Sequence, residues 1–294
     1  MNDGAGASAG CQFTNSQIHQ LTNSTIMFPL RPLVYAHRGG AALRPENTIV
    51  SFDYGLSLGA DGLEFDVRLS RDGVVVVHHD ATLERTTNGR GALSSYTADE
   101  LSHVDAGHWF RPADATRKPG VPDSFPYRGQ GHGIPRLKQV LSRYPGVPLI
   151  IELKVNDPDL AQRTIQDVRA AGAVERVSLG SFGWRVLRAV RKLEPRIPTG
   201  ASREEVRLAL YRSWIRWPLG KEAYQEFQVP ERSGPTRVVS RNFIAHAHRV
   251  GLPVKVWTVN DPADMRRLLD WGVDALISDR PDLAVSVVAA HSRV

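Results

Sequence analysis

The chain has 294 residues, of which 41% are hydrophobic and 23% charged, as in a soluble globular protein of one large or two ordinary domains. No apolar run approaches the roughly 20 residues that span a bilayer, the first ten residues lack the pattern of a secretory signal, and the single cysteine excludes an internal disulfide. The formal charge of +6 fits anionic substrates or lipid surfaces, and it fits a generally arginine-rich proteome at least as well. No nucleic-acid motif is present, so we expect a cytoplasmic protein without a nucleic-acid partner.

Short apolar runs alternate with helical patterns from residue 33 onward. Residues 1–30 are rich in small polar residues and carry too little apolar periodicity to fold, so we expect a disordered extension there and a folded domain over 31–290. The expected strands are Leu33–Ala36, Gly62–Val67, Val74–His78, Pro148–Leu153, Val177–Gly180, Ile197–Gly200, Gln225–Val229, Val254–Val259 and Ala275–Ser278. The expected helices are Asn47–Gly59, Pro158–Gly172, Trp184–Leu193, Ser240–Gly251 and Pro262–Gly272.

The second and third expected strands must pair in the antiparallel direction. Only residues 68–73 separate them, whereas a parallel crossover needs a dozen or more residues. A two-residue turn at Arg71 and Asp72 would place His79 opposite Glu64, and a loop one residue longer would shift that partner by one position. Eight parallel strands then remain, which predicts an α/β fold, a (β/α)8 TIM barrel with an antiparallel hairpin after strand 2.

Two segments depart from the barrel pattern. Residues 98–135 are rich in glycine, proline and aromatic residues, and we expect a small cap insertion at the mouth of the pocket. Residues 208–219 combine arginine with tryptophan and tyrosine. Two interpretations of this stretch stay open: a barrel helix whose apolar face packs on the sheet, or a peripheral contact with anionic lipid that favours lysophospholipid-like substrates.

Carboxylates follow two of the expected strands at a spacing suited to a metal ion. Glu64 and Asp66 are two positions apart on a strand, so both side chains project from one face. Two carboxylates this close repel each other unless a proton or cation lies between them, and Mg²⁺ or Ca²⁺ suits oxygen ligands. Glu152 and Lys154 repeat the spacing on the next barrel strand, where Lys154 can touch a phosphate oxygen.

Basic side chains also lie at strand ends. His37 and His79 form a pair that can divide proton transfer, one ring activating a nucleophile and the other protonating a leaving alkoxide. Arg38 offers a planar fork for two phosphate oxygens. Glu46 has three open roles: support of the metal from outside its ligands, orientation of a histidine, or capping of the first helix.

In this order and spacing, the chain resembles the glycerophosphodiester phosphodiesterase family from about residue 33 to 285. The matching motifs are His37-Arg38-Gly39, Pro45-Glu46-Asn47-Thr48, Glu64-Phe65-Asp66, His79-Asp80, Glu152-Leu153-Lys154, Ser181-Phe182, Trp257-Thr258-Val259-Asn260 and Asp274–Pro281. The resemblance implies a (β/α)8 barrel and metal-dependent hydrolysis of glycerophosphodiesters to glycerol 3-phosphate and an alcohol.

The resemblance also implies residue roles. It implies that His37 and His79 are the acid–base pair. It implies that Arg38 and Lys154 bind the phosphate, and that Glu64, Asp66 and Glu152 are ligands of one divalent cation. Phe182 and Trp257 match aromatic positions of the family's pocket, and both are equally compatible with ordinary core. Water and a neighbouring hydroxyl of the substrate are both open as the nucleophile.

Two alternative functions use the same site. One is lysophospholipase D-type hydrolysis of lysophospholipids, and the other is a catalytically silent barrel that binds phospholipid headgroups. The silent barrel is disfavoured because every catalytic position of the motif set is filled. The sequence predicts no particular headgroup and no particular oligomeric state.

Overall fold

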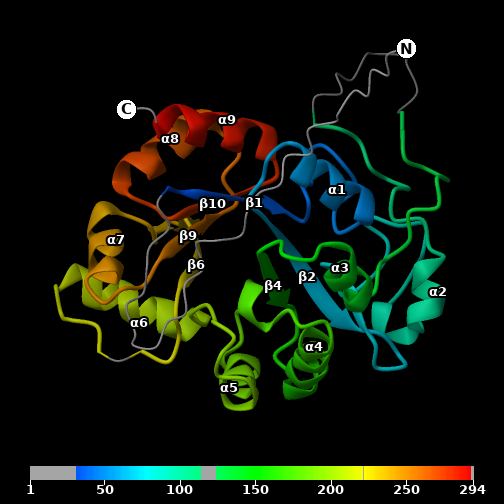
Figure 1. Ribbon diagram of the computed structural model, residues 1–294, viewed down its shortest axis with the longest axis horizontal. Coiled ribbons are helices and arrows are strands. Elements are labelled where there is room, and N and C mark those ends of the chain that lie inside the picture. The colour runs from blue at the N-terminus through cyan, green and yellow to red at the C-terminus, as the bar shows by residue number, and fades with distance from the viewer. Residues whose placement is uncertain (1–30, 114–123, 221, 293–294) are drawn as a thin grey trace, which may run out of the picture.

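The computed structural model describes residues 31–113, 124–220 and 222–292, so the disordered extension expected for residues 1–30 lies outside the described residues. Helices surround a central set of strands (Figure 1). In the described part of the chain, no helix combines the length and the apolar character that a membrane crossing requires.

Seven of the ten strands in the described residues form the predicted parallel barrel. The ten strands are β1 (Leu33–His37), β2 (Gly62–Leu69), β3 (Val75–Val77), β4 (Leu149–Leu153), β5 (Val177–Gly180), β6 (Phe227–Pro230), β7 (Arg232–Ser233), β8 (Thr236–Arg237), β9 (Val254–Trp257) and β10 (Ala275–Ser278). Their order around the barrel is β5-β4-β2-β1-β10-β9-β6, and each neighbouring pair is parallel. β7 and β8 form a separate short hairpin directly after β6.

The strand expected at Ile197–Gly200 is reduced to isolated parallel bridges, one to β5 and one to the residue before β6. Pro198 has no N–H to donate, and the Thr199 N–H donates instead to the side-chain Oε1 of Gln225. A regular ladder therefore does not form here, although the bridges link β5 to β6 and complete the ring.

The hairpin of β2 and β3 is antiparallel, as predicted, but its register differs by one residue. The Ser70 N–H donates to the Val74 carbonyl, so the loop covers 71–73 rather than Arg71 and Asp72 alone. Gly73 lies in the left-handed region, with φ of 73°. A three-residue hairpin loop requires this conformation at one position, and residues other than glycine rarely adopt it. The hairpin therefore follows the longer of the two loops considered, which shifts the partner of His79 by one position from Glu64, as predicted for that loop.

The helices are α1 (Ile49–Ser57), α2 (Ala98–Ser102), α3 (Leu137–Arg143), α4 (Pro158–Ala170), α5 (Trp184–Leu193), α6 (Arg203–Trp214), α7 (Arg241–His248), α8 (Pro262–Trp271) and α9 (Pro281–His291). α2, α3 and α9 were not among the expected helices, and α6 corresponds to one of the two open interpretations of residues 208–219. The start of α6 has a clear sequence signal, because Ser202 and Glu205 cap each other's backbone N–H groups. α9 begins with a proline in its first turn, another common start signal.

Residues of the segment 98–135 pack against the β2–β3 hairpin. Leu101 and Ile134 are buried in a small apolar cluster with Val76 of β3. None of the described residues of this segment lines the central cavity, and residues 114–123 lie outside the described residues. The residues that line this cavity include members of α6 and of the β7–β8 hairpin.

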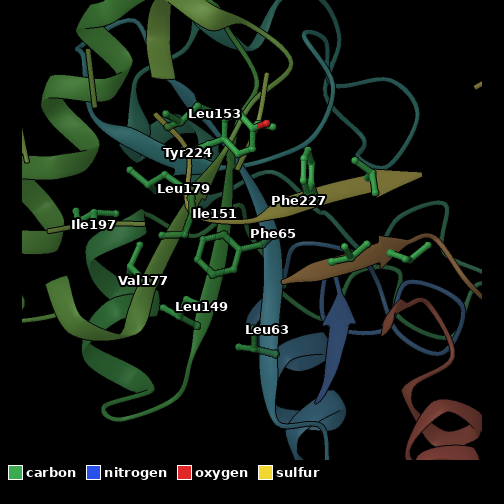
Figure 2. Packing of buried hydrophobic residues seen from close by; sticks show 14 of the residues in the cluster. Leu63, Phe65, Leu149, Ile151, Leu153, Val177, Leu179, Ile197, Tyr224 and Phe227 are labelled. Carbon is green, nitrogen blue, oxygen red and sulfur yellow. The ribbon is translucent and has the colours of Figure 1, made fainter. Parts of the chain in front are cut away.

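The main apolar core lies between the strands and the helices. Figure 2 shows Leu63 and Phe65 of β2 beside Leu149 and Ile151 of β4, in agreement with their register. Since side chains alternate along a strand, the residues between these core positions point into the barrel. The core thereby turns Glu64 toward the interior.

Candidate functional site

Sheet register gathers the polar residues at the carboxyl ends of β1, β2 and β4. His37 is the Cα partner of Glu64, and Asp66 is the Cα partner of Glu152. Because the three strands are parallel neighbours, their carboxyl ends meet at one end of the barrel, where barrel enzymes place their active sites. The structure therefore brings His37 close to Glu152, which lies 115 positions later in the sequence.

Glu64, Asp66 and Glu152 form a compact acidic cluster. Each offers a carboxylate oxygen, and these oxygens all lie within 4.8 Å of one another. Burial, together with the charges of Asp66 and Glu152, raises the pKa of Glu64 to about 8, although His37 opposes this shift. Burial also raises the pKa of Glu152. Such convergence of carboxylates is unfavourable unless positive charge is added.

Asp66 has one oxygen held and one oxygen free. Its Oδ2 accepts a 2.9 Å hydrogen bond from Nδ2 of Asn47. Its Oδ1 is buried but accepts no hydrogen bond from any described residue. Nζ of Lys154 lies 3.5 Å from Oδ1 and donates to Glu152 instead, at 3.0 Å. A buried oxygen without a partner, beside two more carboxylates, fits a hard divalent cation.

Both histidines are held by a carboxylate at Nδ1. The His37 Nδ1 is 2.6 Å from Oδ1 of Asp279, and the His79 Nδ1 is 2.7 Å from Oδ1 of Asp80. Each carboxylate favours the tautomer with the proton on Nδ1, which leaves Nε2 for chemistry in the site. Both rings line the same cavity.

The surroundings shift the pKa values of the two histidines in opposite directions. Burial disfavours a charged ring at His37, but the carboxylates of Glu64 and Asp279 outweigh burial and raise its pKa. At His79, burial outweighs the nearby carboxylates and lowers the pKa.

Asp279 is a site residue that the sequence reasoning missed. It follows β10 directly, and its Oδ2 accepts a 2.8 Å hydrogen bond from Nδ2 of Asn260. The Asn260 Oδ1 in turn accepts from the Asp279 N–H at 2.9 Å. These bonds fix the carboxylate that holds His37. The available signal was a carboxylate directly after an apolar strand, the same signal that marked the acidic cluster.

The turn after β1 aims Arg38 into the site. Arg38 has a left-handed backbone, with φ of 49°, and Gly39 follows with φ of 86°. A Cβ at Gly39 would clash with Ser51 of α1, so only glycine fits there. The Arg38 Nε then lies 3.2 Å from Oδ2 of Asp66, and its Nη1 lies 2.9 Å from Oε1 of Glu46.

Glu46 contacts guanidinium groups. Besides Arg38 it binds Arg85, whose two Nη atoms donate to its two oxygens at 2.7 Å each. These arginines overcome burial and lower the pKa of Glu46 to about 2. Among its three open roles, capping is wrong, because Thr48 is the residue that caps α1. Arg85, which the sequence reasoning missed, also pairs with Asp80 and so connects Glu46 to the support of His79.

A cavity of about 680 Å³ opens over these residues. Its wall includes the predicted residues His37, Arg38, Glu64, His79, Glu152, Lys154, Phe182 and Trp257. The Phe182 and Trp257 rings meet edge to face, with centroids 5.8 Å apart and an interplanar angle of 89°. Phe182 is 42% exposed, so these rings form cavity wall rather than closed core. Glu46 and Asp66 lie behind the wall and support it.

Known proteins share this sequence and fold. Residues 37–283 match the profile of the glycerophosphoryl diester phosphodiesterase family. A glycerophosphodiester phosphodiesterase from Caldanaerobacter subterraneus is 30% identical, over 88% of this chain and 98% of its own length. The crystal structure of a glycerophosphodiester phosphodiesterase from Agrobacterium tumefaciens is 28% identical, with a TM-score of 0.66 over 86% of this chain and 99% of that chain.

A phosphodiesterase from Oleispira antarctica, solved in complex with its product sn-glycerol-3-phosphate, has the same fold. Its TM-score is 0.66 at 24% identity, over 88% of this chain and 97% of that chain.

Proposed function

Because the chain belongs to the glycerophosphoryl diester phosphodiesterase family, we propose that it hydrolyses glycerophosphodiesters to glycerol 3-phosphate and an alcohol, aided by one divalent cation. The observation that carries the proposal is the acidic cluster of Glu64, Asp66 and Glu152 beside a cavity lined by His37 and His79. Three carboxylates supply the ligands, and two histidines supply the proton transfers, that hydrolysis of a phosphodiester needs.

The three carboxylates would hold the cation, Mg²⁺ or Ca²⁺, which would polarise a phosphoryl oxygen and offset the charge of the diester. Asn47 keeps Asp66 in place through its bond to Oδ2, and this leaves Oδ1 directed at the cluster. Lys154 contacts Glu152 without neutralising the whole cluster. The carboxylates are therefore preorganised before substrate arrives.

Arg38 and Lys154 bind the phosphate in this proposal. Both line the cavity beside the acidic cluster, and both keep donors that a phosphate oxygen can accept from. Glu46 and Asp66 fix the direction of the Arg38 fork. Fixed positive groups of this kind stabilise the negative charge that grows on the phosphoryl oxygens in the transition state.

The histidines divide the proton transfers. One ring accepts the proton of the attacking hydroxyl as its oxygen bonds to phosphorus, and the other gives a proton to the alkoxide that leaves. Asp279 and Asp80 hold the Nδ1 atoms, so Nε2 of each ring exchanges the proton. The same pair serves if water attacks directly, or if the glycerol hydroxyl attacks first and forms a cyclic phosphodiester that water opens to glycerol 3-phosphate in a second step.

Release of glycerol 3-phosphate from glycerophosphocholine tests the proposal. We expect EDTA to abolish release and added Mg²⁺ or Ca²⁺ to restore it. His37→Ala and His79→Ala should each lower kcat about 10²–10⁴-fold, the usual contribution of an acid–base group. Arg185→Ala, an exposed change on α5 away from the cavity, is the control and should keep wild-type activity.

Two results would contradict this account. Release that is insensitive to EDTA would overturn the role of the cation. Full activity in His37→Ala would overturn the acid–base pair.

A further inference from the structure

Exposed large apolar side chains gather on α6 and the turn that follows it. Leu208, Tyr211, Trp214, Ile215 and Trp217 are between 48% and 62% exposed, and we call these five residues the aromatic patch. They make up five of the ten large hydrophobic side chains that are exposed in the described part of the chain, although they span only ten positions. Clustering of this kind marks an interaction site, whereas single exposed apolar residues are ordinary.

Packing against the barrel does not account for the aromatic patch. The residues that α6 buries are Ala209, Leu210 and Ser213, two of which are small. The helix thus buries small side chains and exposes tryptophan and tyrosine, the reverse of what hydrophobic burial favours. α6 is a barrel helix, as one open interpretation predicted, but this packing leaves its largest apolar groups in water.

Residues 206–219, which contain the aromatic patch, carry charge of one sign, although Glu204 is exposed in the first turn of the same helix. Residues 206–219 contain three arginines and no aspartate or glutamate. Arg212 pairs with Glu222 at 3.1 Å. Arg207 and Arg216 are exposed, and neither pairs with a carboxylate among the described residues. A surface that combines unpaired arginine with tryptophan complements the interface of an anionic bilayer, where rings lie at headgroup level and guanidinium groups meet phosphates.

A second copy of the chain is a poorer fit to the aromatic patch. A two-fold contact places the same surface of both copies against itself. Arg207 and Arg216 would then face their own counterparts, with no carboxylate from 206–219 to separate them. The like charges oppose self-association, whereas anionic lipid reverses the sign of the interaction.

We propose that the aromatic patch, with Arg207 and Arg216, docks the protein peripherally on anionic lipid bilayers. The same helix contributes Arg203, Val206, Arg207 and Leu210 to the wall of the central cavity. Arg207 therefore belongs to both surfaces, and its neighbour Leu208 belongs to the patch. Docking through α6 brings one wall of the cavity to the lipid surface.

Co-sedimentation with lipid vesicles tests the proposal, with full-length protein and two compositions. We expect the wild type to sediment with vesicles of phosphatidylcholine and phosphatidylglycerol, less with phosphatidylcholine alone, and less at high salt. Trp214→Ala combined with Trp217→Ala should weaken sedimentation about tenfold or more, because both rings leave the interface. Arg216→Gln should weaken binding to the anionic vesicles only.

Trp184→Ala is the matched control, since Trp184 is 47% exposed on α5 outside the aromatic patch and should be replaceable without loss of sedimentation. Thermal unfolding of every variant should match the wild type, because the replaced side chains are exposed. Equal sedimentation of the wild type and the Trp214/Trp217 double variant would overturn the proposal. So would a wild-type dimer that the double variant converts to a monomer, because the aromatic patch would then be a contact between copies.

Discussion

The barrel interior holds buried carboxylates in two places and compensates their charge differently. At the amino ends of the strands, Glu226 accepts hydrogen bonds from Ser178 and Gln228, and its Oε2 is 2.6 Å from Nζ of Lys255. Both of its oxygens have partners. At the carboxyl ends, the acidic cluster leaves Oδ1 of Asp66 buried without a hydrogen bond from any described residue.

The pKa of Glu64 follows the same division, whereas the charges of Arg38 and Lys154 outweigh burial and lower the pKa of Asp66. Burial alone would raise the pKa of Glu226, but the charge of Lys255 and the hydrogen bonds of Ser178 and Gln228 lower it. Burial dominates at Glu64 and raises its pKa to about 8. The first group is complete in itself, as expected at the stabilising end of a barrel, whereas the second is completed by a divalent cation in the function that we propose.

The largest effect that separates the two groups should be on catalysis. Asp66→Asn should lower release of glycerol 3-phosphate from glycerophosphocholine by about 10³-fold, since it removes a charge from the proposed cation site and from the group that orients Arg38. Glu226→Gln should stay within a few-fold of the wild type under the same conditions. Comparable activity losses in the two variants would remove the distinction between the groups.

For stability we expect the opposite order, with a larger loss of unfolding free energy in Glu226→Gln than in Asp66→Asn. Glu226→Gln leaves the buried ammonium of Lys255 without a counter-charge, and it should cost about 3 kcal/mol of unfolding free energy. Urea unfolding measures this loss. Glu226→Gln combined with Lys255→Met should recover most of it, because the second change removes the unpaired charge. An unchanged unfolding free energy in Glu226→Gln would show that the pair of Glu226 and Lys255 does not stabilise the fold.

A smaller effect should appear in the pH dependence of stability. The folded-state pKa of Glu226 is lowered, so its stabilising contribution is present above the unfolded pKa, about 4.3, and is lost as pH falls through the folded pKa. Between pH 6 and pH 3, the wild type should therefore lose more unfolding free energy than Glu226→Gln. The excess should be about 1.4 kcal/mol for every tenfold difference between the acid dissociation constants of Glu226 in the folded and unfolded chains. Urea unfolding at stepped pH checks this, and parallel curves would contradict it.

Much of the barrel and of the acidic cluster could be predicted because the signals are local. Glu64 and Asp66 lie on one strand, and a carboxylate at the end of an apolar run marks the carboxyl end of a parallel strand. The hairpin direction followed from loop length alone. Its register did not, because it depended on the left-handed conformation that Gly73 takes in the loop.

The supporting residues could not be predicted in the same way. Asp279 holds His37 from 242 positions away, and Arg85 reaches Glu46 across 39 positions. No spacing rule covers such contacts, since the first depends on the pairing of β10 with β1 and the second on how the loops after β1 and β3 meet. The exposure of Trp214 and Trp217 has the same origin, because composition cannot tell which side of α6 faces the barrel.

Calorimetric titration of EDTA-stripped protein with Mg²⁺ and with Ca²⁺ tests the central claim most directly, because it reads binding without relying on catalysis. We expect one ion per chain for the wild type and for Glu226→Gln, and loss of that binding in Asp66→Asn. Undiminished binding in Asp66→Asn, or no binding of either ion to the wild type, would contradict the assignment of the acidic cluster as a cation site.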